Sequence, residues 1–219
     1  FYLSKKKLTE KELKELNDYR IFRSQIVKAA EDKVDLLIEH LRQRNLEDLS
    51  HILIYCAPGT IDPITKRVAD LGLRVHNFDH RTSYKKRQEI LDAFDKGHIQ
   101  VILAMNCLDE GVDVPATKEA YFLSSTSNPR EYVQRRGRVL RKYKNKTKAK
   151  IYDFIMLAPP EYVRDSYSIL QSELPRFIEF TEASINKYHI YNQMLRSLEE
   201  MGLERGLLKA RKEYYEKEQ

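Results

Sequence analysis

The sequence contains few of the residues that form disulfide frameworks, metal sites or membrane spans. Its two cysteines, Cys56 and Cys107, lie in apolar, strand-like stretches, which predicts buried free thiols in a reducing compartment. The histidines are scattered, no group of residues has metal-ligand spacing, and no apolar run approaches the length of a membrane span. Residues 1–3 are apolar and precede three lysines, which reverses the order of a secretory signal. We therefore expect an intracellular, cytoplasmic protein with no metal site and no membrane contact. Because the chain starts without Met, we also expect it to be a piece of a longer protein.

What the sequence does contain is an uneven distribution of positive charge. The 219 residues carry a net charge of +6, and the basic excess is concentrated in residues 135–150. This concentration favours contact with the phosphates of a nucleic acid or a nucleotide over contact with a small neutral ligand. A membrane surface is the alternative, but the basic helices lack the wide aromatic face that interfacial helices use.

The hydrophobic pattern predicts an α/β protein with helical segments at both ends. Short apolar runs alternate with helical stretches at residues 62–71 and 83–96, which predicts a RecA-like parallel sheet with helices on both faces. The predicted strands are residues 51–56, 73–78, 99–104, 120–123 and 150–155. In such sheets ligands bind at the carboxyl ends of the strands. The corresponding loops are residues 57–60, 79–82, 104–115 and 124–128.

Three segments follow from this pattern: residues 1–46, 47–158 and 159–219. The first is predicted to form two amphipathic helices that pack on the central domain, with Thr9 and Glu12 as a capping box. The last has an apolar stripe from Tyr188 to Met201, interpreted as core packing, with a partner helix as the alternative. In this last segment we expect Pro175 to interrupt the first helical stretch, and Gly202 and Gly206 to interrupt the apolar stripe.

Residues 134–141 are the densest basic stretch, and they are predicted to lie on one helix. Asn128 is a suitable N-cap, with Pro129 at the first helical position and Glu131 three residues after the cap. Two faces follow from the helical spacing, each with members at i, i+4 and i+7. The face predicted to pack consists of Val133, Gly137 and Leu140. The face predicted to meet an anion consists of Gln134, Arg138 and Arg141.

A solvated basic helix is the alternative interpretation of residues 134–141. A glycine inside such a helix costs about 1 kcal/mol relative to alanine. The charged face also lacks the acidic partners that i,i+4 pairing would use. A polyanion is therefore the preferred partner, because guanidinium groups bind phosphate in a planar, bidentate manner. Arg135 and Arg136 lie off the charged face and are expected either to pair with Asp or Glu or to touch nucleic acid.

A second group of polar residues follows the third predicted strand. Asp109 and Glu110 are adjacent, so they point apart in most backbones, and they do not favour a separate metal or acid–base site. Gly111 is expected to allow a turn or a close backbone approach. Asp113 could accept hydrogen bonds from a ribose, as acidic residues do in other nucleotide-binding sheets.

These stretches resemble the conserved motifs of superfamily 2 helicases. Residues 108–115 are similar to motif V, residues 134–141 to motif VI, and residues 51–60 to motif IV. Residues 83–94 resemble the helix that precedes motif V, so the resemblance covers residues 48–156. It identifies the chain as similar to the second, C-terminal RecA-like domain. Gln134 in place of His points to the DExH and restriction- or repair-type DNA helicases.

The resemblance implies an ATP site with Mg²⁺ between two RecA-like domains, with the metal held by the first. This chain contains no G-x-x-x-x-G-K-[ST] loop, so the first domain would be its partner and the chain alone would be inactive. In the family, Arg138 and Arg141 would be arginine fingers, Gln134 would position the attacking water or the γ-phosphate, and Gly111 and Asp113 would contact the ribose. The residues expected to hold a DNA (or RNA) backbone are Pro58, Gly59, Thr60, Arg81, Thr82, Met105, Asn106 and Cys107.

Two departures from the family pattern, and two alternative functions, accompany this interpretation. Val139-Leu140 replaces the common Thr-Gly, and Met105-Asn106 stands where a Thr or Ser is usual. A non-catalytic docking module is the alternative function, although it would have no use for the finger residues. A Rossmann-type enzyme lacks its glycine fingerprint here. Residues 160–219 could also bind a protein partner.

Overall fold

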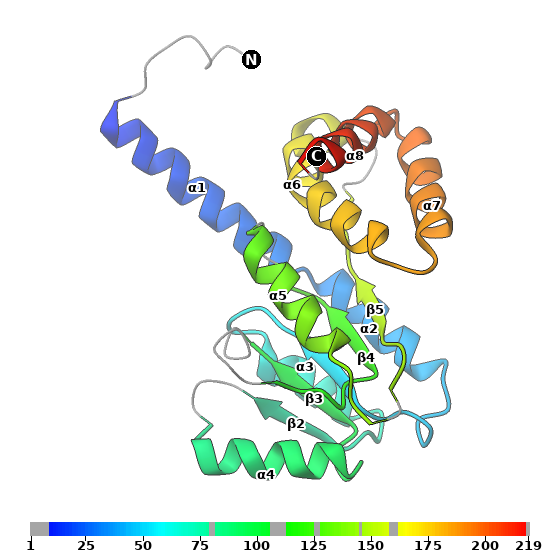
Figure 1. Ribbon diagram of the computed structural model, residues 1–219. Helices are drawn as coiled ribbons and strands as arrows, with labels where there is room; N and C mark the ends of the chain where they lie inside the picture. Colours follow the sequence, from blue (N-terminus) through cyan, green and yellow to red (C-terminus); the bar gives the residue numbers. More distant parts are fainter. Residues whose placement is uncertain are drawn as a thin grey trace. The chain divides into compact units, whose positions relative to one another are not determined.

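A computed structural model of the chain describes residues 9–78, 82–105, 113–124, 128–144, 146–157 and 162–217. The chain forms two compact units, residues 1–107 and 108–219. Figure 1 shows the helices and strands of both.

The first unit begins with two helices, α1 (Glu10–Lys28) and α2 (Glu31–Arg42). The predicted capping box is confirmed: Thr9 Oγ1 accepts a hydrogen bond from the backbone N–H of Glu12 (3.3 Å), and the Glu12 carboxylate accepts one from the Thr9 N–H (2.8 Å). Helix α2 buries its apolar face, as predicted; the buried apolar residues are Leu37, Ile38 and Leu41.

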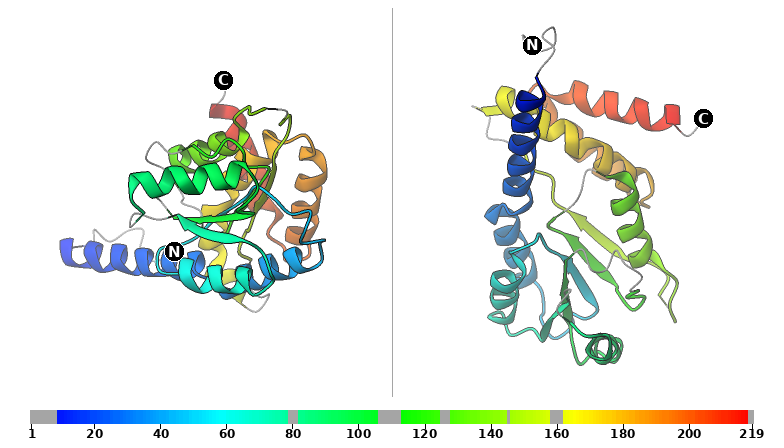
Figure 2. Two further views of the ribbon diagram at one scale, coloured as in Figure 1. Left: turned by 90° about the horizontal axis from the view of Figure 1, so that it is seen from below. Right: turned by 90° about the vertical axis from the view of Figure 1, so that its left-hand side faces the viewer.

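Helix α1 does not pack as the sequence predicted. It extends away from the strands of its own unit (Figures 1 and 2), and none of its described side chains is buried. Tyr19 and Phe22 are 72% and 62% exposed. Its apolar residues are spread around the helix instead of forming one stripe, so no single face can be buried.

The first unit contains three parallel strands, β1 (Ile52–Tyr55), β2 (Val75–Phe78) and β3 (Val101–Ala104). Every residue of β1 and β3 is buried, as expected for a sheet covered on both faces. Ala104 pairs with both Tyr55 and Phe78, so the three strands end at the same edge. The segments that follow the three strands therefore start at the same edge of the sheet.

Two helices follow β1 and β2 in this unit, α3 (Ile61–Ala69) and α4 (Tyr84–Asp95). Ser83 caps α4 as predicted, because its hydroxyl accepts a hydrogen bond from the Lys86 N–H (3.4 Å). Helix α4 buries Ile90 and Phe94.

The described residues of the second unit form two parallel strands and four helices. The strands are β4 (Glu119–Phe122) and β5 (Lys150–Asp153), and the rings of Tyr121 and Tyr152 stack between them at 4.5 Å. The helices are α5 (Pro129–Leu140), α6 (Val163–Glu182), α7 (Lys187–Glu199) and α8 (Glu204–Lys217). The strand order is β2-β3-β1 in the first unit and β4-β5 in the second, and the parallel pairing in both confirms the predicted α/β, parallel fold.

Helices α6, α7 and α8 pack against one another around a separate apolar core (Figures 1 and 2). Tyr191 and Leu198 of the predicted stripe are buried in it, whereas Tyr188 is 70% exposed. The stripe is thus mainly core packing. Among the described helices, none has both the length and the apolar character needed to cross a membrane.

Two expectations for these helices were wrong. Pro175 lies inside α6 without ending it; Leu174, Phe177 and Ile178 are buried around it, and this packing offsets the missing backbone hydrogen bond. Gly206 lies inside α8 without interrupting a helix, and it permits close approach to α6.

The position of Gly206 generates a stability prediction. A Cβ there would lie 2.9 Å from the Tyr167 hydroxyl oxygen and 3.2 Å from Leu174 Cδ1. We expect Gly206→Ala to lower the free energy of unfolding by about 1 kcal/mol, because overpacking of about 1–3 kcal/mol exceeds the gain in helix propensity. Gly137→Ala is the matched control: a Cβ there meets no atom within 4 Å, so only the gain remains. In urea unfolding, the two variants should change the free energy of unfolding in opposite directions. A change of the same sign in both would contradict the close approach of α8 to α6 at Gly206.

Candidate functional site

Helix α5 begins where the sequence predicted. Asn128 Oδ1 accepts a hydrogen bond from the Arg130 N–H (3.1 Å), and the Asn128 amide donates to Glu131 Oε1 (3.0 Å). Pro129 occupies the first helical position. The cap fixes the start of the helix, and therefore which side chains share each face.

The face of α5 that packs differs from the predicted one. Val133 and Leu140 are 37% and 46% exposed, and Gly137 makes no close approach. The buried residues of α5 are instead Tyr132, Arg135 and Val139. Arg135 can be buried because its guanidinium donates to the carbonyl oxygen of Ser124 (3.4 Å) and lies 4.0 Å from the Glu131 carboxylate. Hydrophobic periodicity missed this face because two of its three residues have polar tips.

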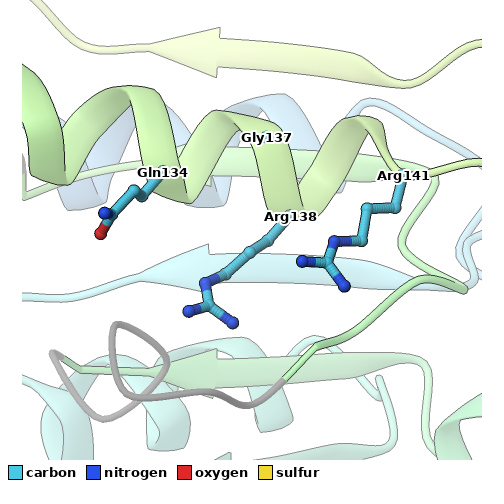
Figure 3. A pocket seen from close by; sticks show the side chains of 4 residues that line it. All are labelled: Gln134, Gly137, Arg138 and Arg141. Atoms are coloured by element: carbon cyan, nitrogen blue, oxygen red, sulfur yellow. The ribbon is translucent and has the colours of Figure 1, made fainter.

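The charged face is as predicted. Gln134, Arg138 and Arg141 line one pocket of about 460 Å³ together with Gly137. Figure 3 shows the three side chains extending to the same side of α5, with Gly137 between them. Because Gly137 has no side chain, the space between Gln134 and the two arginines stays open.

Asp113 is the carboxylate that faces the two arginines. Its Oδ1 accepts a hydrogen bond from Arg138 (3.0 Å), and its Oδ2 accepts one from Arg141. Arg138 is only 15% exposed, whereas Arg141 is 56% exposed. Two neighbouring guanidinium groups repel each other, and the shared carboxylate offsets that repulsion. The sequence predicted Asp113 as a ribose acceptor; the structure brings it to the arginines, a pairing that the sequence analysis missed.

The opposite side of α5 is held by α6. Arg136 donates to the backbone oxygen of Glu179 (2.8 Å) and to its carboxylate (2.9 Å), and its guanidinium lies 5.6 Å from the Phe180 ring centre. Phe180 also makes edge-to-face contacts with Tyr132 and with Phe122 of β4. The expectation that Arg136 pairs with an acidic residue is confirmed. Burial, and then the nearby Glu179 carboxylate, raise the pKa of Tyr132.

A buried ion cluster attaches α6 to the end of β5. Arg176 is 2% exposed, and it contacts Asp153 (3.0 Å) and Glu173 (2.7 Å). Burial by itself lowers the pKa of Arg176, but the two carboxylates outweigh it and raise this pKa above its ordinary value. Removing one member of such a cluster would leave an uncompensated buried charge, so α6 is firmly held at β5.

The predicted nucleic-acid residues belong to the first unit, and the structure describes five of them. Pro58 and Gly59 are exposed in the loop after β1, and the Thr60 hydroxyl donates to the Ala57 carbonyl oxygen (2.9 Å). Met105 directly follows β3. The carbonyl oxygen of Thr82 accepts a hydrogen bond from Arg87 (2.8 Å). Four other predicted residues lie outside the described residues: Arg81, Asn106 and Cys107, and the proposed nucleotide contact Gly111.

The cysteines and the candidate metal ligands were the other residues considered in the sequence. Cys56 is buried and free, as predicted, and burial raises the pKa of its thiol. Cys107 lies outside the described residues. In the part of the chain that the structure describes, no group of three His, Cys, Asp or Glu residues could hold a metal ion.

Comparison with known proteins identifies the family. The profile of the helicase conserved C-terminal domain matches residues 32–143, and the chain belongs to this family, as a second RecA-like domain of superfamily 2. It is 41% identical over 63 residues, 29% of the chain, to the DNA 3'-5' translocase XPB2 of Sulfurisphaera tokodaii. It is 27% identical over 111 residues, 47% of the chain, to UvrABC system protein B of Micrococcus luteus. The matched regions cover only 14% and 16% of these relatives, so the chain corresponds to a small part of their length.

Solved structures confirm the fold. The chain is similar to the C-terminal domain of the DEAD-box protein Dbp5, with a TM-score of 0.51 and 20% identity over 68% of this chain and 81% of that one. The C-terminal part of the Fun30 ATPase domain has a TM-score of 0.52 at 18% identity, over 63% of this chain and 44% of that one. At these identities the likeness concerns the fold alone.

The contact between α5 and α6 can be tested by stability. We expect Arg136→Ala to lower the free energy of unfolding by about 1–3 kcal/mol, because two hydrogen bonds to Glu179 are lost and its carboxylate is left without this partner. Arg130→Ala, an exposed arginine on the same helix, should change it by less than about 0.5 kcal/mol. Thermal or urea unfolding measures both. Equal effects would show that Arg136 does not hold α5.

Proposed function

We propose that this chain is the second motor domain of an ATP-dependent helicase or translocase acting on nucleic acid, with DNA as the expected substrate. The observation that carries the proposal is the pocket on α5, in which one amide and two guanidinium groups face the same space. Membership of the helicase C-terminal family supports it. A docking platform would not need these three side chains on one face.

In the proposed mechanism, Arg138 and Arg141 act as arginine fingers on the γ-phosphate of ATP. They stabilise charge that develops in the phosphoryl-transfer transition state, a contribution of about 10³–10⁵ in rate for such fingers. The Mg²⁺ that accompanies ATP would be held by the first RecA-like domain and would neutralise charge on the phosphates. Gln134 positions the attacking water or the γ-phosphate, and Asp113 and Gly111 contact the ribose.

Asp113 also prepares the arginines for this task. It holds both guanidinium groups at the pocket before a phosphate arrives. When the γ-phosphate enters, the arginines can exchange one anionic partner for another, so no bare positive charge has to be desolvated. This use of Asp113 and its ribose contact are compatible, because a carboxylate has about four acceptor sites.

The nucleic-acid contacts are proposed for the loops at the carboxyl edge of the first unit. The register of β1, β2 and β3 supports this proposal, because it makes their following segments leave the same edge. The residues concerned are Pro58, Gly59, Thr60, Arg81, Thr82, Met105, Asn106 and Cys107. Backbone contacts carry little sequence information, so binding is expected to be non-specific and salt-dependent. The partial match to a DNA translocase favours DNA.

The finger assignment predicts the effect of Arg141→Ala in the complete protein. We expect ATP hydrolysis to be abolished while ATP affinity stays near normal, because the finger acts mainly in the transition state. Steady-state turnover and equilibrium nucleotide binding measure the two effects. Lys142→Ala, an exposed neighbour, is the control and should keep turnover. Unchanged turnover in Arg141→Ala would refute the finger role and favour a docking module.

A second prediction concerns the 219-residue chain by itself. We expect no ATPase activity, with or without DNA, because the sequence contains no phosphate-binding loop. The measurement is phosphate release by a purified preparation, compared with the complete protein at equal molarity. Turnover that copurifies with the chain through successive columns would mean that the chain contains the phosphate-binding parts assigned to the first domain.

A further inference from the structure

In the basic segment, residues 135–150, the ammonium group of Lys146 is surrounded by backbone carbonyl oxygens. Its Nζ donates hydrogen bonds to Pro115 O (2.6 Å), Thr117 O (3.1 Å) and Val139 O (2.9 Å). The backbone N–H of Lys146 donates to the Tyr143 carbonyl oxygen (2.8 Å), and this hydrogen bond holds the backbone from which its side chain starts. An ammonium group has three N–H donors, and here all three are used.

The three carbonyl oxygens come from the segment that carries Asp113 and from the last turn of α5, which carries the arginines. Pro115 and Thr117 lie two and four residues after Asp113, and Val139 lies between Arg138 and Arg141. The ammonium therefore ties the segment of the carboxylate to the end of the finger helix. The last carbonyl groups of a helix have no partners within it, so a cation there also satisfies the helix dipole.

The sequence placed Lys146 among residues expected to meet phosphate, but its contacts favour another role. A lysine with three protein acceptors has no N–H left for a phosphate oxygen. Burial lowers the pKa of Lys146, which agrees with its partial withdrawal from solvent. Lys148, two residues further along the chain, is exposed and has no hydrogen bond or ion pair to any described residue.

We propose that Lys146 is a positioning residue that sets the distance between Asp113 and the fingers Arg138 and Arg141. This inference rests on the proposed function of those fingers. Displacing catalytic groups by about 1 Å can cost roughly 10²-fold in rate, so a residue that fixes their spacing should affect turnover more than nucleotide binding.

The experiment compares Lys146→Met, Lys146→Arg and Lys148→Met in the complete protein. Lys146→Met should lower kcat by about 10–100-fold with the KM for ATP within about twofold of the wild type. Lys146→Arg should behave like Lys146→Met although it keeps the charge, because a planar guanidinium cannot replace a three-donor ammonium. Lys148→Met should leave both constants unchanged. Wild-type kcat in Lys146→Arg would overturn the proposal in favour of a simple charge effect.

Two further readouts separate positioning from other roles. In the 219-residue chain, amide hydrogen exchange at residues 114–118 and 139–144 should accelerate in both Lys146 variants, with protection of the β1 and β3 amides unchanged; a global loss of protection would overturn local positioning. In the complete protein, the salt dependence of nucleic-acid binding should not change. A phosphate contact would instead reduce the slope by about 0.7–0.9, which would also overturn the proposal.

Arg141→Ala, assayed in parallel, distinguishes this inference from the function on which it rests. If Arg141→Ala keeps full turnover, the finger assignment fails. If Arg141→Ala abolishes turnover and Lys146→Met does not lower kcat, the fingers stand and the positioning role of Lys146 is wrong.

Discussion

The attraction between the Asp113 carboxylate and the guanidinium groups of Arg138 and Arg141 is the interaction on which the rest of the site depends. Two arginines at the end of a short helix repel each other, even though the helix dipole favours cations there. A carboxylate between them allows both to point into the same pocket. Three other contacts in the second unit support this arrangement: the Asn128 cap at the start of α5, the packing of α5 against α6, and Lys146 at the end of α5.

Much of the positive charge of the chain is used internally. Arg135 and Arg136 lie within the basic stretch of residues 134–141. Arg135 is nevertheless buried against Ser124, and Arg136 is bound to Glu179. Arg176 is buried between two carboxylates, and Lys146 is surrounded by carbonyl oxygens. The net charge therefore overestimates how many basic side chains are available to bind a polyanion. The cations that lie in the pocket of α5 are Arg138 and Arg141.

The sequence was sufficient for the parts of the structure that local rules determine. Alternating apolar runs predicted all five strands, and capping residues predicted the starts of α1, α4 and α5. The spacing of Gln134, Arg138 and Arg141 predicted that they share one face of a helix, and they line one pocket on it. What it missed depends on contacts between distant segments: the burial of Arg135, the pairing of Asp113 with the arginines and the place of Gly206 in a helix contact. Such contacts leave no periodic pattern, because a polar residue is buried only where a partner far along the chain satisfies it.

The family profile ends at residue 143, whereas the aromatic and ionic contacts behind α5 come from α6, which begins at Val163. A deletion designed from the conserved region, or at the boundary near residue 158 that the sequence suggests, would remove Glu179, Phe180 and Arg176 together. Either deletion would expose Phe122 and Tyr132 to water, and the deletion near residue 158 would also leave Asp153 without its buried counter-ion. Loss of function after such a truncation would therefore report damage to the finger helix, and would not by itself demonstrate a binding role for the C-terminal helices. Substitutions on the exposed faces of α7 and α8 are the cleaner way to study those helices.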